Sequence, residues 1–285
     1  MEKKTIISLL NKDLEDEHGA IIQYLSHAYA MGEGEMACEI EAIARDEMRH
    51  LDWLAETVVA LGGTPSLERG KMLMGDGAVS NWMQNNVLLE EGAITQYKEH
   101  IEAIGDPKIK RLLGRILADE ESHHGSFQHF VSKAQKEVAR DRRGNNQDKT
   151  ASLLNWGIEH EYTVILQYLL HSYLARKEAV KQEMEDQAIN EMQHLGWLAE
   201  EMVGSGGNPR IEHSSVYRGN KTADRLQADI KVEQEVAAEY DRAARESKEP
   251  DLKKLLLRIR DNEKYHIDVF NDLLQEEKEQ QGSGI

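Results

Sequence analysis

The chain has 285 residues, more than one ordinary domain, and carries a formal charge of -17 from 52 acidic and 35 basic residues. A nucleic-acid surface needs clustered Lys and Arg to neutralise phosphates, so this balance excludes that class of partner. Charged residues make up 31% of the chain and there are only 4 Pro, which favours long amphipathic helices and an all-α fold.

Cysteine use and hydropathy indicate where the protein resides. Cys38 is the only cysteine, which excludes a disulfide within the chain and any site built from four thiolates. The N-terminal residues lack the apolar core and cleavage site of a signal peptide, and no apolar run reaches 18 residues. We therefore expect a cytoplasmic protein that does not enter the membrane.

The first half of the chain predicts four helices. Apolar spacing indicates a helix over residues 5–31 and a second one that ends at the turn Gly62-Gly63-Thr64-Pro65. The interval up to residue 78 is a crossover, long enough for the second and third helices to run parallel. The third helix spans 80–104, and the fourth begins at Asp106-Pro107 and reaches 138.

The second half repeats this order, with helices over 150–175, 178–203, 221–247 and 251–279. The polar, turn-rich stretch 141–150 between the halves is the predicted linker. We expect domain 1 over residues 1–140, domain 2 over 151–281 and a tail over 282–285. Each half is long enough to bury its own core.

Four Glu-x-x-His motifs form two matched sets. The motif at Glu47 returns 144 residues later at Glu191, and the motif at Glu120 returns 143 residues later at Glu263. A single Glu stands ahead of each motif, and a Tyr follows that Glu by seven residues. The offset changes by one after a shared Gly-Gly-x-Pro turn, where a loop can absorb a deletion. The pattern indicates an internal duplication.

Residues three apart on a helix share a face, so each motif aims a carboxylate and an imidazole at one point. Two such motifs, with one Glu from each of two further helices, form the ligand set of di-iron and di-manganese four-helix bundles. Oxygen-rich ligation with imidazole suits iron or manganese. The predicted metal-binding and catalytic residues are Glu17, Glu47, His50, Glu90, Glu120 and His123, and Glu161, Glu191, His194, Glu233, Glu263 and His266.

The segments RDEMRHLDWLAE and LADEESH resemble the second-helix and fourth-helix signatures of bacterioferritin, and both halves are similar to it over nearly their whole lengths. The resemblance implies two ferritin-like four-helix bundles, packed as a pseudo-dimer, each with one di-iron centre. It also implies that Glu47 with Glu120, and Glu191 with Glu263, bridge the metal ions. Rubrerythrin fits less well, because its four-cysteine module and its extra third-helix Glu are missing here.

The same resemblance points to further residues. Tyr24 and Tyr168 are candidates for hydrogen bonding to a ligand or for electron transfer, with ordinary core packing as the alternative. Met48 and Met192 stand where bacterioferritin has its axial haem ligand, although Met is also a common packing residue. Asp52 and Asp268 follow a ligand His by two residues and are candidates for orienting that imidazole.

These features predict a ferroxidase that oxidises Fe(II) with dioxygen or hydrogen peroxide, in iron handling and peroxide protection. A di-iron oxidase or oxygenase acting on an organic substrate, a manganese catalase-like enzyme, and a non-catalytic protein that binds iron or haem stay open as alternatives. A homo-oligomer is compatible with the fused halves. The absence of an evident fifth helix after each bundle argues against a storage cage.

Overall fold

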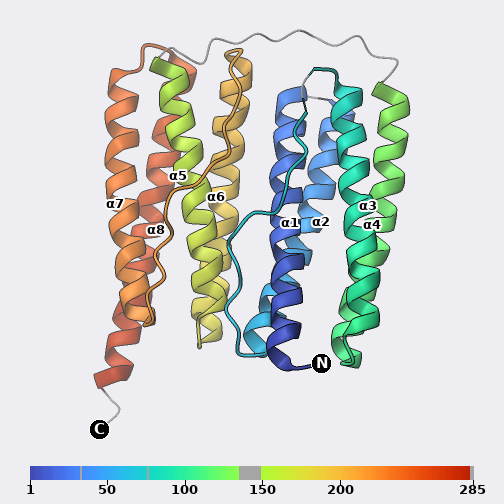
Figure 1. Cartoon of the computed structure of the whole chain (residues 1–285). Helices are drawn as coiled ribbons and strands as arrows, with labels where there is room; N and C mark the ends of the chain where they lie inside the picture. The colour runs from blue at the N-terminus through green and yellow to red at the C-terminus, as the bar shows by residue number, and fades with distance from the viewer. Residues whose placement is uncertain (33, 76, 135–148, 283–285) are drawn as a thin grey trace. The chain divides into compact units, whose positions relative to one another are not determined.

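The computed structural model describes residues 1–32, 34–75, 77–134 and 149–282, and these residues form eight α-helices and no strand (Figure 1). The all-α prediction is confirmed. The chain divides into two compact units, Met1–Arg143 and Gly144–Ile285. The helices are α1 (Lys3–Met31), α2 (Glu35–Ala60), α3 (Val79–Ala103), α4 (Pro107–Ala134), α5 (Lys149–Tyr173), α6 (Glu178–Gly204), α7 (Thr222–Glu246) and α8 (Pro250–Gly282).

The helix ends follow local chemistry. The side chain of Asp106 accepts hydrogen bonds from the backbone N–H groups of Lys108 and Ile109, at 2.8 and 3.2 Å, and so caps the start of α4. Gly62 and Gly206 adopt positive φ angles of 76° and 80° just past α2 and α6, as the Gly-Gly turns predict. Pro at the first position of α4 and α8 provides the φ angle that a helix start requires.

Two predicted boundaries move. Helix α5 begins at Lys149, so the last two residues of the predicted linker 141–150 are helical, while 141–148 lie outside the described residues. Helix α8 continues to Gly282, and the remainder of the predicted tail, 283–285, also lies outside the described residues. The pseudo-dimer packing of the two bundles stays a prediction.

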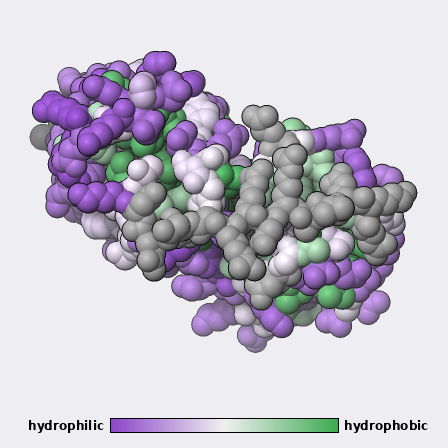
Figure 2. All heavy atoms as spheres, turned by 90° about the horizontal axis from the view of Figure 1, so that it is seen from above, coloured by the Kyte–Doolittle hydropathy of each residue, from purple (hydrophilic) through white to green (hydrophobic). Residues whose placement is uncertain are grey.

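Each unit is built from two helical hairpins. Helix α1 packs most extensively on α2 and α3 on α4, and the hairpins meet through α1 with α3 and α2 with α4. The second unit repeats this arrangement with α5, α6, α7 and α8. Apolar side chains fill the interior, and in the view onto the helix ends hydrophobic residues show between helices whose outer faces are hydrophilic (Figure 2). The fully buried aromatic residues include Tyr24, Phe127, Tyr168 and Phe270.

The crossovers between the hairpins, 61–78 and 205–221, run along the bundles rather than away from them (Figure 1). Polar residues of α1 hold the first crossover at several points. Asn11 binds the backbone of Thr64 and Ser66, and Gln23 accepts from the N–H of Leu73. The matched residues of α5, Asn155 and Gln167, accept from backbone N–H groups of the second crossover. In each bundle, matched polar residues of the first helix therefore hold the crossover by hydrogen bonds to its backbone.

Among the helices of the described residues, none combines the length and apolar character needed to cross a membrane.

Candidate metal centres

The structure brings all twelve predicted ligand residues into two buried clusters, one in each bundle. In each bundle the first and third helices contribute one Glu, and the second and fourth contribute one Glu-x-x-His motif. No ligand residue is more than 4% exposed. Helical spacing places each motif on the inward face, as the sequence predicts.

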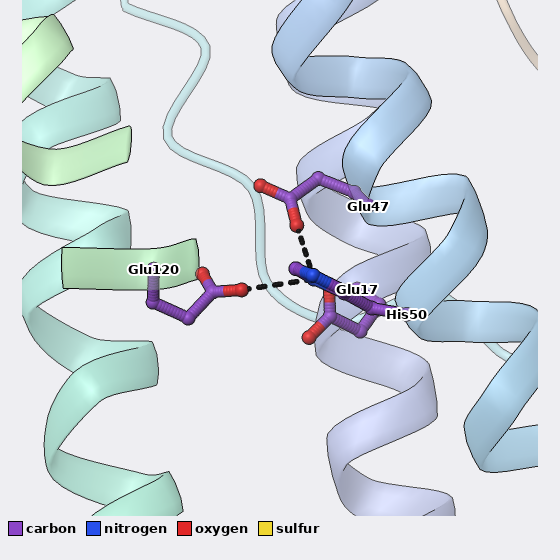
Figure 3. Close-up of side chains that lie close together, drawn as sticks. All are labelled: Glu17, Glu47, His50 and Glu120. Atoms are coloured by element: carbon purple, nitrogen blue, oxygen red, sulfur yellow. Dashed lines mark ion pairs between the residues drawn. The ribbon is translucent and has the colours of Figure 1, made fainter. Parts of the chain in front are cut away.

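Each cluster contains two overlapping groups whose donor atoms lie within 4.8 Å of one another. In the first bundle, one group consists of Glu17, Glu47, His50 and Glu120 (Figure 3). The other has Glu90 and His123 as its own members and shares Glu47 and Glu120. The second bundle repeats the pattern, with Glu191 and Glu263 shared between the groups Glu161, Glu191, His194, Glu263 and Glu191, Glu233, Glu263, His266. Shared carboxylates at these places are the arrangement required to bridge two ions.

The imidazoles point their Nδ1 atoms into the clusters. His50 Nδ1 lies 2.8 Å from Glu47 and 3.0 Å from Glu120 (Figure 3). His123 Nδ1 lies 3.0 Å from Glu47. In the second bundle His194 Nδ1 lies 2.7 Å from Glu191 and 3.1 Å from Glu263. Each Nδ1 is thus placed to act as a ligand beside the bridging carboxylates.

The inward-facing atoms of these clusters have no geometrically suitable hydrogen-bond partner among the described residues. They include both carboxylate oxygens of Glu47 and Glu191 and the Nδ1 atoms of all four motif histidines. Leaving ionised groups buried without partners costs several kcal/mol each, on the order of what a bound cation would recover. Four carboxylates in each cluster balance the charge of two divalent cations. The donor set therefore fits a pair of metal ions.

Electrostatics within the first cluster separate the carboxylates. Burial, reinforced by the charge of Glu47, raises the pKa values of Glu17 and Glu120 to about 8. Burial opposes ionisation of Glu47 as well, but the nearby imidazoles of His123 and His50 outweigh it and lower that pKa to about 2. Glu47 therefore carries the charge, and Glu17 and Glu120 hold protons until a cation replaces them.

In the second cluster, burial and the neighbouring charges also separate the pKa values of the carboxylates. Burial, with the charge of Glu263, raises the pKa of Glu161 and of Glu233 well above the ordinary value. Burial also opposes ionisation of Glu191, but the charges of His194 and His266 lower its pKa overall. In both bundles the Glu of the motif on α2 or α6 is thus more acidic than the single Glu of the first helix.

Four buried tyrosines hold the outer carboxylates, and they do so crosswise between hairpins. The hydroxyl of Tyr24 on α1 donates to Glu90 on α3 at 2.5 Å, while Tyr97 on α3 donates to Glu17 on α1. The second bundle repeats both bonds, from Tyr168 to Glu233 and from Tyr240 to Glu161. Tyr97 and Tyr240 follow their Glu by seven residues, so the repeated spacing was the signal for a role that the sequence analysis did not assign.

The outward nitrogens of the histidines reveal residues that the sequence analysis missed. His50 Nε2 lies 3.2 Å from Asp119 on α4, and His123 Nε2 lies 3.4 Å from Asp46 on α2. The expectation had placed this support on Asp52 and Asp268. The available signal was that Asp precedes the ligand Glu in both motifs of the first half.

A cavity of about 240 Å³ leads to the first cluster between α1 and α3. Its polar lining includes the ligands Glu17, Glu90 and Glu120 together with Asp13, Asp16 and Lys71. Asp13 also pairs with the buried His100, at 2.7 Å. Five carboxylates against one Lys make this cavity suited to a cation rather than to an anion.

The second bundle differs at the matched positions. Where the first bundle has Lys12 and Asp16 on α1, the second has Trp156 and His160 on α5. The two rings stack with centroids 5.7 Å apart, and Trp156 packs edge-on against Tyr240 at 5.5 Å. Gly157 stands opposite Tyr240 in place of Asp13. The ring of His160 thus occupies the lining position matched to Asp16, and Gly157 leaves the position matched to Asp13 without a side chain.

Met48 and Met192 lie on α2 and α6, one residue after a shared Glu, and both are partly exposed. This position is compatible with a surface role. Their assignment as haem ligands stays a prediction.

Comparison with known proteins is consistent with these clusters. Residues 7–136 and 151–279 each match the Ferritin family model, described as a ferritin-like domain. A bacterioferritin of Desulfovibrio desulfuricans is 34% identical over 137 residues, which cover 46% of this chain and 76% of the relative. A bacterioferritin of Streptomyces coelicolor is 32% identical over 124 residues, covering 41% and 74%. An X-ray structure of the Desulfovibrio protein, described as showing its diiron site in different catalytic states, is similar with a TM-score of 0.45 at 31% identity, covering 47% of this chain and 81% of that chain.

Proposed function

We propose, from the premise that this chain belongs to the ferritin-like family, that each of its two bundles holds a di-iron centre that oxidises Fe(II) with dioxygen or hydrogen peroxide. Relationship to bacterioferritins supports iron handling by an oxidoreductase at the level of the family. The observation that carries the finer proposal is the pair of overlapping ligand groups in each bundle, which share two carboxylates.

In this proposal the residues have distinct roles. Glu47 and Glu120 in the first bundle, with Glu191 and Glu263 in the second, would hold both ions of a pair, because they belong to both groups. The remaining Glu and the His of each group serve one ion each. When the centre is filled, two Fe(II) ions supply two electrons to the oxidant.

The tyrosines and the cavity serve the same chemistry. Tyr24 and Tyr97 hold the end carboxylates in orientation, and their counterparts Tyr168 and Tyr240 do so in the second bundle. The acidic cavity beside Glu17 gives Fe(II) a polar route to the first centre.

The proposal also includes the cellular compartment and whether oxidised iron is stored as a mineral. A reducing cytoplasm would supply Fe(II) and keep the exposed Cys38 as a thiol. Tandem fusion joins in one chain two domains of the kind that match the relatives separately. We therefore propose oxidation without bulk mineral storage and protection of the cell from peroxide.

Metal analysis combined with an Fe(II) oxidation assay tests the proposal. The chain should bind four iron ions and consume the oxidant, while Glu47→Ala and Glu191→Ala should each remove about half of the bound iron. Glu39→Ala, which changes an exposed carboxylate on the same helix as Glu47, is the matched control and should leave the iron content unchanged. Iron binding without oxidant consumption would favour a non-catalytic iron protein, and native manganese would favour the catalase-like alternative.

A further inference from the structure

The two clusters have the same types of ligand residue, but they differ in the residue that precedes each motif Glu. In the first bundle the residue before each motif Glu is an aspartate, Asp46 or Asp119. In the second bundle the matched residues are asparagines, Asn190 and Asn262. Both positions change in the same direction, from an anionic to a neutral side chain of nearly equal size.

In the first bundle, these aspartates lie across the bundle from the imidazole that they contact. Asp119 on α4 faces Nε2 of His50 on α2 at 3.2 Å, and Asp46 on α2 faces Nε2 of His123 on α4 at 3.4 Å. A carboxylate can only accept here, so it fixes the proton on Nε2 and leaves Nδ1 as the metal ligand. An imidazole held in this way is also a stronger electron donor to a metal ion.

In the second bundle, one of the two contacts is kept but its chemistry changes, while Asn190 donates to Gln187 on its own helix. Asn262 Nδ2 on α8 lies 2.9 Å from Nε2 of His194 on α6. These helices correspond to α4 and α2, which carry Asp119 and His50. An amide offers either an acceptor oxygen or donor hydrogens, so it carries no net charge and does not enforce one tautomer. His194 therefore receives weaker electronic support than His50.

The difference in charge favours different oxidation states. Four ligand carboxylates balance two Fe(II) in either centre. Asp119 adds negative charge only around the first centre, where it would stabilise two Fe(III), whereas the charge of Asp46 is partly balanced by its ion pair with Arg49. Asp46 and Asp119 are 34% and 43% exposed, so water screens part of this effect. We propose that the two centres are not equivalent, and that the aspartate-supported centre has the lower reduction potential.

This inference rests on the proposed function, because it assumes that iron occupies both clusters. Single-centre proteins allow each potential to be measured alone: Glu191→Ala keeps the first centre and Glu47→Ala keeps the second. Iron-loaded samples are poised at a series of potentials, and Mössbauer spectroscopy gives the Fe(II) fraction at each. The midpoint should be lower for the first centre than for the second.

Exchanging the supporting residues provides the decisive comparison. Asp46→Asn with Asp119→Asn should raise the midpoint of the first centre, and Asn190→Asp with Asn262→Asp should lower that of the second. The matched control is Glu121→Gln, which removes one charge from an exposed side chain on α4 that pairs with Lys98. It should leave the first midpoint nearly unchanged.

Equal midpoints for the two single-centre proteins, or exchanges that shift nothing, would overturn the inference while leaving the ferroxidase proposal standing, provided that each centre holds two iron ions. A Glu121→Gln shift as large as that of the aspartate exchange would overturn it too, since the effect would then be general surface charge. Failure of either cluster to retain iron would instead contradict the proposed function on which the inference depends.

Discussion

Divalent ions should stabilise the two bundles independently, because each bundle contains a complete ligand set and no ligand is shared between them. Manganese(II) is a suitable probe, since it fits oxygen and imidazole ligands. An ion that binds only the folded state, present at 100 times its dissociation constant, adds about 2.7 kcal/mol to the free energy of unfolding. For a bundle of this size that corresponds to a rise in Tm of roughly 5 to 11 °C.

Differential scanning calorimetry of metal-free and manganese-loaded protein measures this shift. In the Glu47→Ala chain, the transition of the first bundle should stop responding to manganese while that of the second bundle still rises. The Glu191→Ala chain should show the reverse. If manganese does not change the Tm of the unmodified chain, the assignment of these clusters as metal sites is refuted. Loss of both responses in one single variant would refute the independence of the centres.

Three further substitutions test packing and polar contacts by urea unfolding of the metal-free chain. Gly70→Ala should cost about 1 to 3 kcal/mol, because its Cβ would stand 2.7 Å from a backbone oxygen of α1, whereas Gly114→Ala, on an open face of α4, should add up to about 1 kcal/mol; equal effects would contradict this. Tyr24→Phe should cost about 1.5 to 3 kcal/mol through the lost bond to a buried carboxylate, and an unchanged midpoint would argue against that bond. Asp229→Ala should cost about 3 to 5 kcal/mol by leaving His171 without its partner at 2.9 Å, and Asp229→Asn, which reproduces the first bundle, should cost clearly less. Similar losses for both Asp229 variants would show that its charge is essential.

Much of the fold could be predicted from the sequence, because the duplication presents the sequence pattern of each helix twice. The third helix was expected over 80–104 and is found over Val79–Ala103, and the sixth was expected over 178–203 and is found over Glu178–Gly204. Pro107 and Pro250 marked helix starts in both halves. Turn chemistry and helical periodicity act locally, so they can be recognised without tertiary contacts.

The ligands could also be predicted, since a Glu-x-x-His motif places both donors on one face of its own helix. The residues that form hydrogen bonds with those ligands could not be predicted. Asp119 stands four residues before the histidine of its own motif, His123, yet its contact is with His50 on another helix. It reaches His50 only because α4 packs against α2, and the crosswise bond from Tyr97 to Glu17 likewise depends on the packing of α1 against α3. Such contacts require the three-dimensional arrangement.

The division of each bundle into two hairpins gives a bound metal pair a mechanical role. In the first bundle α1 and α2 carry three of the ligands, while α3 and α4 carry the other three. Packing within each hairpin is far more extensive than packing between hairpins. Ions held by Glu47 and Glu120 would therefore act as a cross-link at the less extensive interface, in addition to the apolar core, the tyrosine bonds and the polar contacts that join the hairpins. Release of the metal would loosen the seam between the hairpins before it loosens either hairpin.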